Sequence, residues 1–180
     1  MISLFLNRIY RSIKIDPGVF DEIQKDKKAT PSAAILVLLT TIGVLIALYL
    51  VSGSRSIIFS GSALFIFGSI IALVMWIISS YIIYFIGVKM FPDKKTNISF
   101  VSLLNVLGFA YAPALIRVFS FTENLFKVLW VGSWFWVFAC SAVAIKQCLN
   151  YKNLSKAFAV LIASLFIQSL PILYLILRTK

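Results

Sequence analysis

The residues with the most chemical potential lie in one apolar stretch, residues 105–117, Asn-Val-Leu-Gly-Phe-Ala-Tyr-Ala-Pro-Ala-Leu-Ile-Arg. Asn105 contributes an amide and Arg117 a guanidinium, while Pro113 lacks an N–H and crowds the carbonyl four residues earlier. In hydrocarbon every backbone group needs an internal partner, so neighbouring helices or side chains must satisfy that carbonyl. The stretch therefore predicts a broken helix at the centre of a membrane bundle.

The rest of the chain offers little for catalysis. It contains no histidine and no C-x-x-C, serine-nucleophile, P-loop or dinucleotide-binding motif. Two cysteines, Cys140 and Cys148, are eight residues apart, too far along one helix to form a disulfide. All six acids lie outside the apolar segments: Asp16, Asp21, Glu22, Asp26, Asp93 and Glu123. We expect a protein that is not an enzyme and that has no catalytic residue, cofactor or metal site.

Polar and small residues inside the apolar segments have structural interpretations. Asn105 and Gln147 are expected to form hydrogen bonds between helices. Arg117 is expected to extend toward the outer interface, with contact to a substrate or partner as the alternative. Gly108 and Ala112 have the spacing of small residues that lets two helices approach closely. This seam could lie within one chain or between copies.

The composition identifies an integral membrane protein. The 180 residues are 61% hydrophobic and 13% charged, with a mean hydropathy of +1.00. Five segments are long enough to cross a hydrocarbon core, which needs about 20 residues: residues 32–52, 61–87, 100–121, 125–145 and 157–177. We expect an all-α five-helix transmembrane bundle at 32–180, preceded by a cytoplasmic segment at 1–31.

The N-terminal segment predicts an amphipathic helix. At 100° per residue, Phe5 and Ile9 share an apolar face with Ile2, Leu6 and Ile13, while a polar face carries Arg8, Arg11 and Lys14 with Asn7. Such a helix can lie in the headgroup plane or on the cytoplasmic face of the bundle, and the two arrangements are compatible. Asp16, Pro17 and Gly18 end it, and residues 19–23 form a short second helix.

The basic residues predict the orientation. The net charge is +11, and twelve of the 17 lysines and arginines fall in residues 1–31 and the second and fourth connecting segments. Basic loops stay on the cytoplasmic side, so we expect an inside N-terminus and an outside C-terminus. These bases flank apolar spans, so the expected partner is anionic lipid rather than nucleic acid.

Several features in order resemble the YIP-domain family of five-span membrane proteins, named for Ypt/Rab-interacting proteins. They are the amphipathic start, Asp16-Pro17, then Phe20-Asp21-Glu22-Ile23, and Ser155-Lys156-Ala157 before the last span. The most specific element is Gly108, Phe109, Ala110, Tyr111, Ala112 and Pro113 in the third span. The resemblance implies a cytoplasmic N-terminus, five helices and a role in membrane organisation or traffic through protein partners.

Only about thirty residues precede the first span, whereas eukaryotic members carry a longer cytosolic region associated with GTPase binding. We therefore expect a prokaryotic member in the bacterial cytoplasmic membrane. The leading hypothesis is a non-enzymatic scaffold or assembly factor that binds membrane or peripheral proteins, with a second copy of the chain as a further candidate. The alternatives are a small transporter or channel that uses the broken third span, and a lipid or curvature sensor that uses the N-terminal helix.

Overall fold

The N-terminal segment forms two short helices joined by a tight turn. The computed structural model describes residues 2–52, 61–93, 96 and 98–178. Helix α1 spans Ile2–Ile13, and Ile15 turns the chain with a φ of 57°. Asp16 then caps α2, Pro17–Lys25: its carboxylate accepts from the N–H of Gly18 at 2.9 Å, and Pro17 occupies the first turn, where no N–H is needed. Asp16 and Pro17 thus begin the second helix; the first has already ended at Ile13.

Five apolar helical segments long enough to cross a membrane follow, as predicted. They are α3, Thr30–Ser52; α4, Gly61–Tyr84, extended by the π-helical turn η1, Phe85–Met90; α5, Phe100–Ala110, followed by the 3₁₀-helix η2, Ala112–Phe119; α6, Glu123–Cys148; and α7, Leu154–Arg178. The described part of the chain is all-α. The fourth span begins and ends two or three residues beyond the predicted 125–145, and the fifth starts at Leu154 instead of 157.

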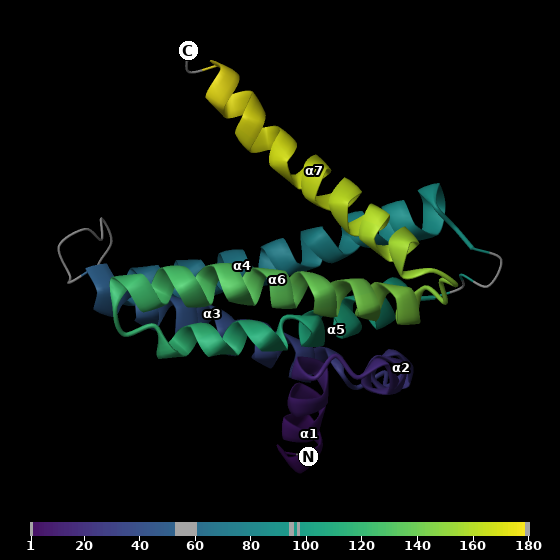
Figure 1. Cartoon of the computed structure of the whole chain (residues 1–180), viewed down its shortest axis with the longest axis horizontal. Coiled ribbons are helices and arrows are strands. Elements are labelled where there is room, and N and C mark those ends of the chain that lie inside the picture. Colours follow the sequence, from purple (N-terminus) through teal and green to yellow (C-terminus); the bar gives the residue numbers. More distant parts are fainter. Residues whose placement is uncertain (1, 53–60, 94–95, 97, 179–180) are drawn as a thin grey trace.

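The third span is the centre of the bundle, as its sequence predicts. It is 61% buried by the rest of the chain, while no other span exceeds 39%. Every residue from 103 to 110 is buried. Helices α3, α4 and α6 surround it, and α6 runs antiparallel beside it after a connection of three residues, 120–122 (Figure 1).

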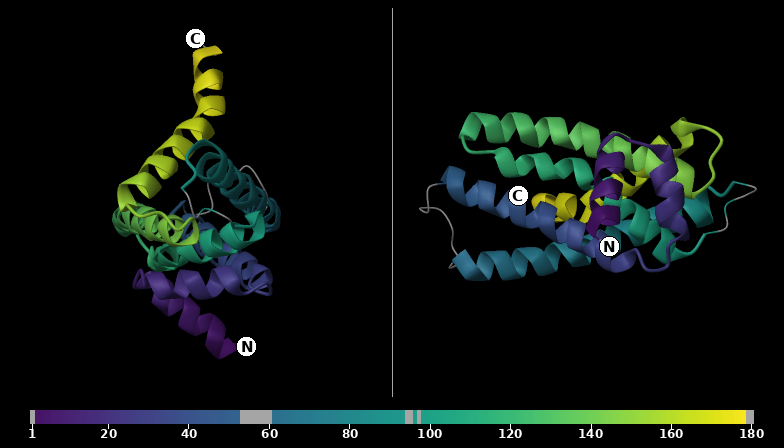
Figure 2. Two further views of the ribbon diagram at one scale, coloured as in Figure 1. Left: turned by 90° about the vertical axis from the view of Figure 1, so that its right-hand side faces the viewer. Right: turned by 90° about the horizontal axis from the view of Figure 1, so that it is seen from below.

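The two N-terminal helices lie across one side of the bundle, roughly perpendicular to its long helices (Figure 2). Helix α1 packs on α5 and η2, and α2 packs on α5 and α6. Val19, Phe20 and Ile23 of α2 are fully buried in the same core as α5. These helices are therefore joined to the five-span bundle by a shared hydrophobic core.

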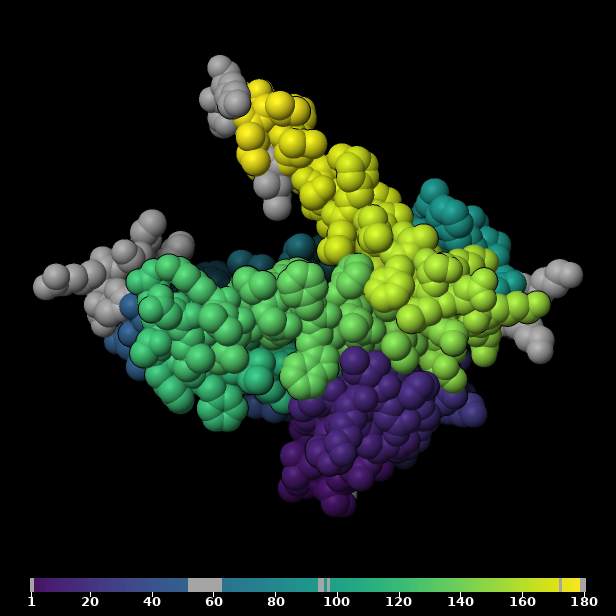
Figure 3. All heavy atoms as spheres, in the orientation of Figure 1, coloured from purple at the N-terminus to yellow at the C-terminus, as the bar shows by residue number. Residues whose placement is uncertain are grey.

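Helix α7 leaves the bundle. Its first half contacts α6 and α4, and its second half points away from all other helices (Figures 1 and 3). Only 18% of this span is buried, and Leu173, Tyr174 and Leu177 are 47%, 61% and 67% exposed. A membrane must cover this surface with lipid or with another helix.

Candidate functional site

The break in the third span lies at Tyr111. Helix α5 ends at Ala110, and the backbone N–H of Tyr111 donates to the carbonyl of Gly108 at 3.4 Å. The chain then tightens into η2, where Ala114 N–H donates to Tyr111 O at 2.9 Å. Pro113 falls in the first turn of η2, so its missing N–H costs no hydrogen bond. The sequence predicted a broken helix in this stretch, and the structure shows the break at Tyr111, with Pro113 in the first turn of a second, narrower helix.

Gly108 is a point of close helix approach. A Cβ placed on it would lie 2.8 Å from the Cβ of Ala33 on α3 and 3.1 Å from the Trp76 ring on α4. Ala112 and Pro113 are also buried. The seam of small residues therefore joins three helices of one chain. At Gly108 it lies within the chain and not between two copies.

Phe109 connects the third span to the N-terminal helix. Its fully buried ring meets the ring of Phe5 edge to face, with centroids 6.1 Å apart. Ile9 of α1 is 9% exposed and belongs to the same core. Two of the residues expected at the membrane surface, Phe5 and Ile9, thus pack on the bundle, while Ile2 and Leu6 of the same predicted face are exposed.

Arg8 and Arg11 form ion pairs with the second helix. Arg8 is 6% exposed, and its guanidinium lies 3.0 Å from Glu22 and 2.8 Å from Asp26. Arg11 bonds Asp16 at 2.7 Å and Glu22 at 2.9 Å. The bond from Arg11 holds the pKa of Asp16 below its ordinary value, and the bond from Arg8 does the same for the pKa of Asp26. We expected both arginines at the membrane surface, but their guanidinium groups are directed at α2. Lys14, the third basic residue expected there, is exposed.

Two contacts between α1 and α6 were missed from the sequence. The indole N–H of Trp136 donates to the carbonyl of Ile13 at 3.0 Å, and the thiol of Cys140 donates to that of Ser12 at 3.3 Å. The carbonyls at the C-terminal end of α1 lack partners within the helix, and these bonds add to the one that Ser12 accepts from the N–H of Ile15 at 2.9 Å. A signal for the ion pairs did exist, because four of the six acids follow directly after Arg8 and Arg11 in residues 16–26.

The two polar side chains expected between helices behave differently. Gln147 donates to the carboxylate of Asp21 on α2 at 2.6 Å, so this bond between helices is confirmed. Asn105 is 1% exposed, and its Oδ1 has no hydrogen-bond partner among the described residues. The interhelical bond expected of that oxygen is thus absent from the described residues.

Arg117 is held over the aromatic face of α6. Its Nε donates to the hydroxyl of Ser133 at 2.6 Å, and its guanidinium carbon lies 4.4 Å from the centre of the Trp130 ring. A cation–π contact contributes about 0.5–2 kcal/mol, whereas an arginine inside a bilayer costs about 2.5–3.5 kcal/mol or more. The ring offsets only part of the cost of placing this charge in a span.

Arg117 and Tyr111 line a partly open cavity of about 270 Å³ between α3, α4, η2 and α6. A second cavity of about 110 Å³ continues beneath α7, and both have Trp76, Ser79 and Tyr111 in their walls. The break in the third span thus opens space inside the bundle. In the described part of the chain no cluster of three or more cysteine or acidic side chains is arranged to hold a metal ion.

Comparison with protein-family models gives a match to the Yip1 domain over residues 11–176. This chain belongs to the Yip1-domain family. The matched region contains α2, the first four spans and α7 up to residue 176, so the family resemblance inferred from the sequence is confirmed over most of the chain. No curated protein and no solved structure matches the sequence. The protein is an integral multi-pass membrane protein of a trafficking-related family.

Proposed function

We propose that this Yip1-domain protein is a non-enzymatic scaffold or assembly factor that organises membranes by binding protein partners. The observation that carries the proposal is the course of α7. The hydroxyl of Ser79 on α4 donates to the side-chain carbonyl of Gln168 on α7 at 2.6 Å. Beyond Gln168, α7 leaves its neighbouring helices (Figure 3). A span that leaves its own bundle presents a whole helical face for packing in the membrane.

Two further features support a binding role. Pro171 lies inside α7, beyond Gln168, and removes a backbone donor from the projecting half. The central seam at Gly108 is filled by Ala33 and Trp76 of the same chain, so it is not available to a partner. We therefore place the partner surface on α7, with another membrane protein or a second copy as its occupant.

Site-specific photocrosslinking in native membranes tests this proposal. A photoreactive amino acid at Leu173 on the projecting half of α7 should give a discrete protein adduct. The matched control is Ile71 on α4, which is 60% exposed but belongs to a helix packed in the bundle. Lipid adducts alone at both positions would refute the placement of the partner surface.

We also propose an orientation with a cytoplasmic N-terminus and a C-terminus on the opposite side. The loop containing Asp93 is joined to the start of α7 by Lys156, which donates to the carbonyl of Pro92 at 3.0 Å. The loops rich in lysine therefore share one end of the bundle, which supports the charge argument. Arg55, Lys94, Lys95 and Lys180 lie outside the described residues.

A small transporter or channel is the second candidate, because the break at Tyr111 borders the partly open cavity. Its test is the labelling of cysteines introduced at Thr41 and Ala114, both in the cavity wall, by a membrane-impermeant maleimide. A transport path predicts labelling at both positions. Native Cys140 and Cys148 are buried and serve as internal negative controls.

A further inference from the structure

Among the described residues, the charge of Arg117 has no acidic partner. All six Asp and Glu residues of the chain are described, and each of them has another partner. Asp16, Glu22 and Asp26 pair with α1, Asp21 accepts from Gln147, Asp93 lies 3.9 Å from Lys156, and Glu123 pairs with Lys127 at 2.6 Å. Arg117 therefore brings an uncompensated positive charge to the cavity within the membrane-spanning region.

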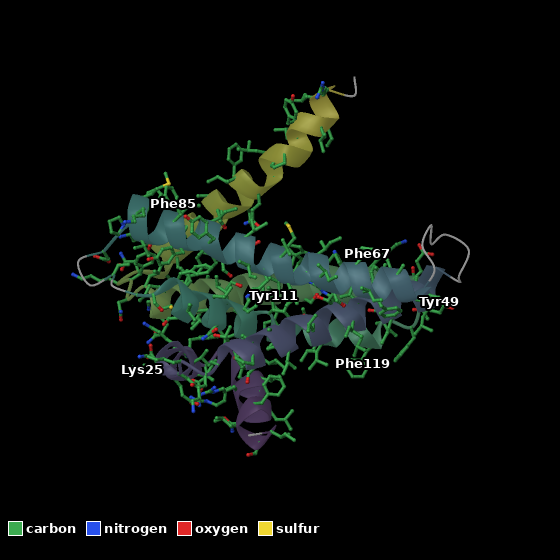
Figure 4. All side chains as sticks on the ribbon, turned by 180° about the vertical axis from the view of Figure 1, so that it is seen from behind. Lys25, Tyr49, Phe67, Phe85, Tyr111 and Phe119 are labelled. Atoms are coloured by element: carbon green, nitrogen blue, oxygen red, sulfur yellow. The ribbon has the colours of Figure 1, made fainter. Side chains whose placement is uncertain are left out.

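Two buried donors without partners among the described residues belong to side chains that line these cavities. Trp76 is 6% exposed and lines both cavities, yet its indole Nε1 has no partner among the described residues. Ser80, which lines the second cavity, is 1% exposed and its hydroxyl is likewise without a partner there. Tyr111, labelled near the middle of the bundle in Figure 4, is 38% exposed and lines both cavities.

The remaining hydroxyl groups of the first cavity are already committed as donors. Thr40 and Thr41 both donate to the carbonyl of Val37 at 2.8 Å, and Ser79 donates to Gln168. No carboxylate lines either cavity in the described part of the chain. The groups that lack partners are thus a cation and neutral donors, which together suit a ligand that carries negative charge and accepts hydrogen bonds.

The lining and the volume of the first cavity fit a ligand with an apolar portion. Val44, Leu45, Met75 and Trp130 complete the wall around Arg117. Helix α7 contributes no residue to the wall of this first cavity, whereas Leu161, Ser164, Leu165 and Gln168 of α7 line the second. The first cavity holds about 270 Å³, several times the roughly 30 Å³ of one water molecule.

We propose that Arg117 is the centre of a binding site for a phosphate-bearing anion within the bundle. The planar guanidinium has N–H groups beyond the Nε used by Ser133, and these can bind two phosphate oxygens side by side. Tyr111 lines the same cavity and its phenol can supply a further donor, and Trp130 holds the guanidinium from its ring face. The phosphate can come from a phospholipid headgroup or from free inorganic phosphate.

Binding to the full chain in detergent micelles tests the proposal. The probes are dioleoylphosphatidylglycerol, dioleoylglycerol, which has the same acyl chains without phosphate, and sodium phosphate; thermal unfolding reports binding. Phosphatidylglycerol should raise the melting temperature and dioleoylglycerol should not. Arg117→Gln should weaken the apparent affinity about tenfold or more, since a charge-assisted hydrogen bond is lost. The apparent affinity of Arg117→Lys should lie between those of the wild-type chain and Arg117→Gln.

Lys127→Gln is the matched control. Lys127 lies on α6, is exposed and is paired with Glu123. Its replacement also removes one positive charge, and should leave lipid binding unchanged. An Arg117-dependent response to sodium phosphate also supports the site and identifies free phosphate as a source. Equal responses to the two lipids without a phosphate response in the wild-type chain would overturn the proposal, whether or not Arg117→Gln folds. So would unchanged binding by a folded Arg117→Gln.

Discussion

Gly108 of α5 faces Ala33 of α3 so closely that a Cβ on Gly108 would lie 2.8 Å from the Cβ of Ala33. The ring of Trp76 closes the other side of the same position at 3.1 Å. Three helices of the chain therefore meet where a side chain larger than hydrogen has no room. This contact, rather than a reactive group, explains why glycine stands in the middle of an apolar span.

Gly108→Leu should destabilise the bundle by about 1–3 kcal/mol or more, because overpacking forces helices and side chains to shift. Thermal unfolding in detergent measures this loss. Gly132→Leu on α6 is the matched control, since nothing lies within 4 Å of a Cβ there, and it should have little effect. Equal stability of the two variants would contradict the packing assigned to Gly108.

Arg8→Gln should release α1 from α2. The change removes the bonds to Glu22 and Asp26, at an expected cost of about 1–2 kcal/mol, since those carboxylates are about one third exposed. The mobility of a spin label at exposed Ser3 measures the release. Lys14→Gln removes an equal charge from the residue directly after α1 without touching α2, and should leave the mobility of the label unchanged.

Acid should have the same effect on the wild-type chain. The pKa values of Asp16 and Asp26 lie below their ordinary 3.8 in the folded protein. Their stabilising contribution is therefore present above pH 3.8 and disappears as the pH falls through the lowered values. The Ser3 label should become mobile below that pH, and a label that responds near neutral pH would argue against these carboxylates.

Tyr151→Phe should loosen the junction between η1 and the loop before α7. The phenol of Tyr151 lies 2.8 Å from the carbonyl of Gly87 and 3.0 Å from that of Phe91, and its loss should cost about 0.5–1.5 kcal/mol. Burial raises the pKa of Tyr151 to about 12. Wild-type stability should thus be complete below pH 10 and decline toward pH 12, while the decline in Tyr151→Phe should be smaller.

A reporter that is active only in the cytoplasm should be inactive at the C-terminus and active at the N-terminus. The basis is the concentration of lysine and arginine in alternate connecting segments, which resist translocation. Activity assays of the two fusions measure the orientation. A cytoplasmic C-terminus would require an even number of crossings and would overturn the proposed topology.

The five spans could be predicted because long apolar runs separated by charged loops leave few alternatives in a bilayer. The central place of the third span also followed from Pro113 and Gly108, since both need close neighbours. The switch to a 3₁₀-helix at Tyr111 could not be predicted, because it depends on how η2 packs against α3 and α6.

The divergence of α7 from the bundle could not be predicted either, because an apolar span that faces lipid has the same composition as one that faces protein. The direction of the N-terminal charges was misjudged for a related reason. Periodicity correctly places Arg8 and Arg11 on one face of α1, but it does not say whether that face meets headgroups or another helix. For Arg8 the partners are Glu22 and Asp26, which lie 14 and 18 residues away in the chain.

The most direct test of the scaffold proposal is the mass of the complex extracted from native membranes into polymer nanodiscs, measured by native mass spectrometry. We predict that the 20.2 kDa chain is recovered with a second protein chain, either another membrane protein or a second copy, and that Leu173→Arg reduces this species. Repeated recovery of the single chain with lipid alone would contradict the account.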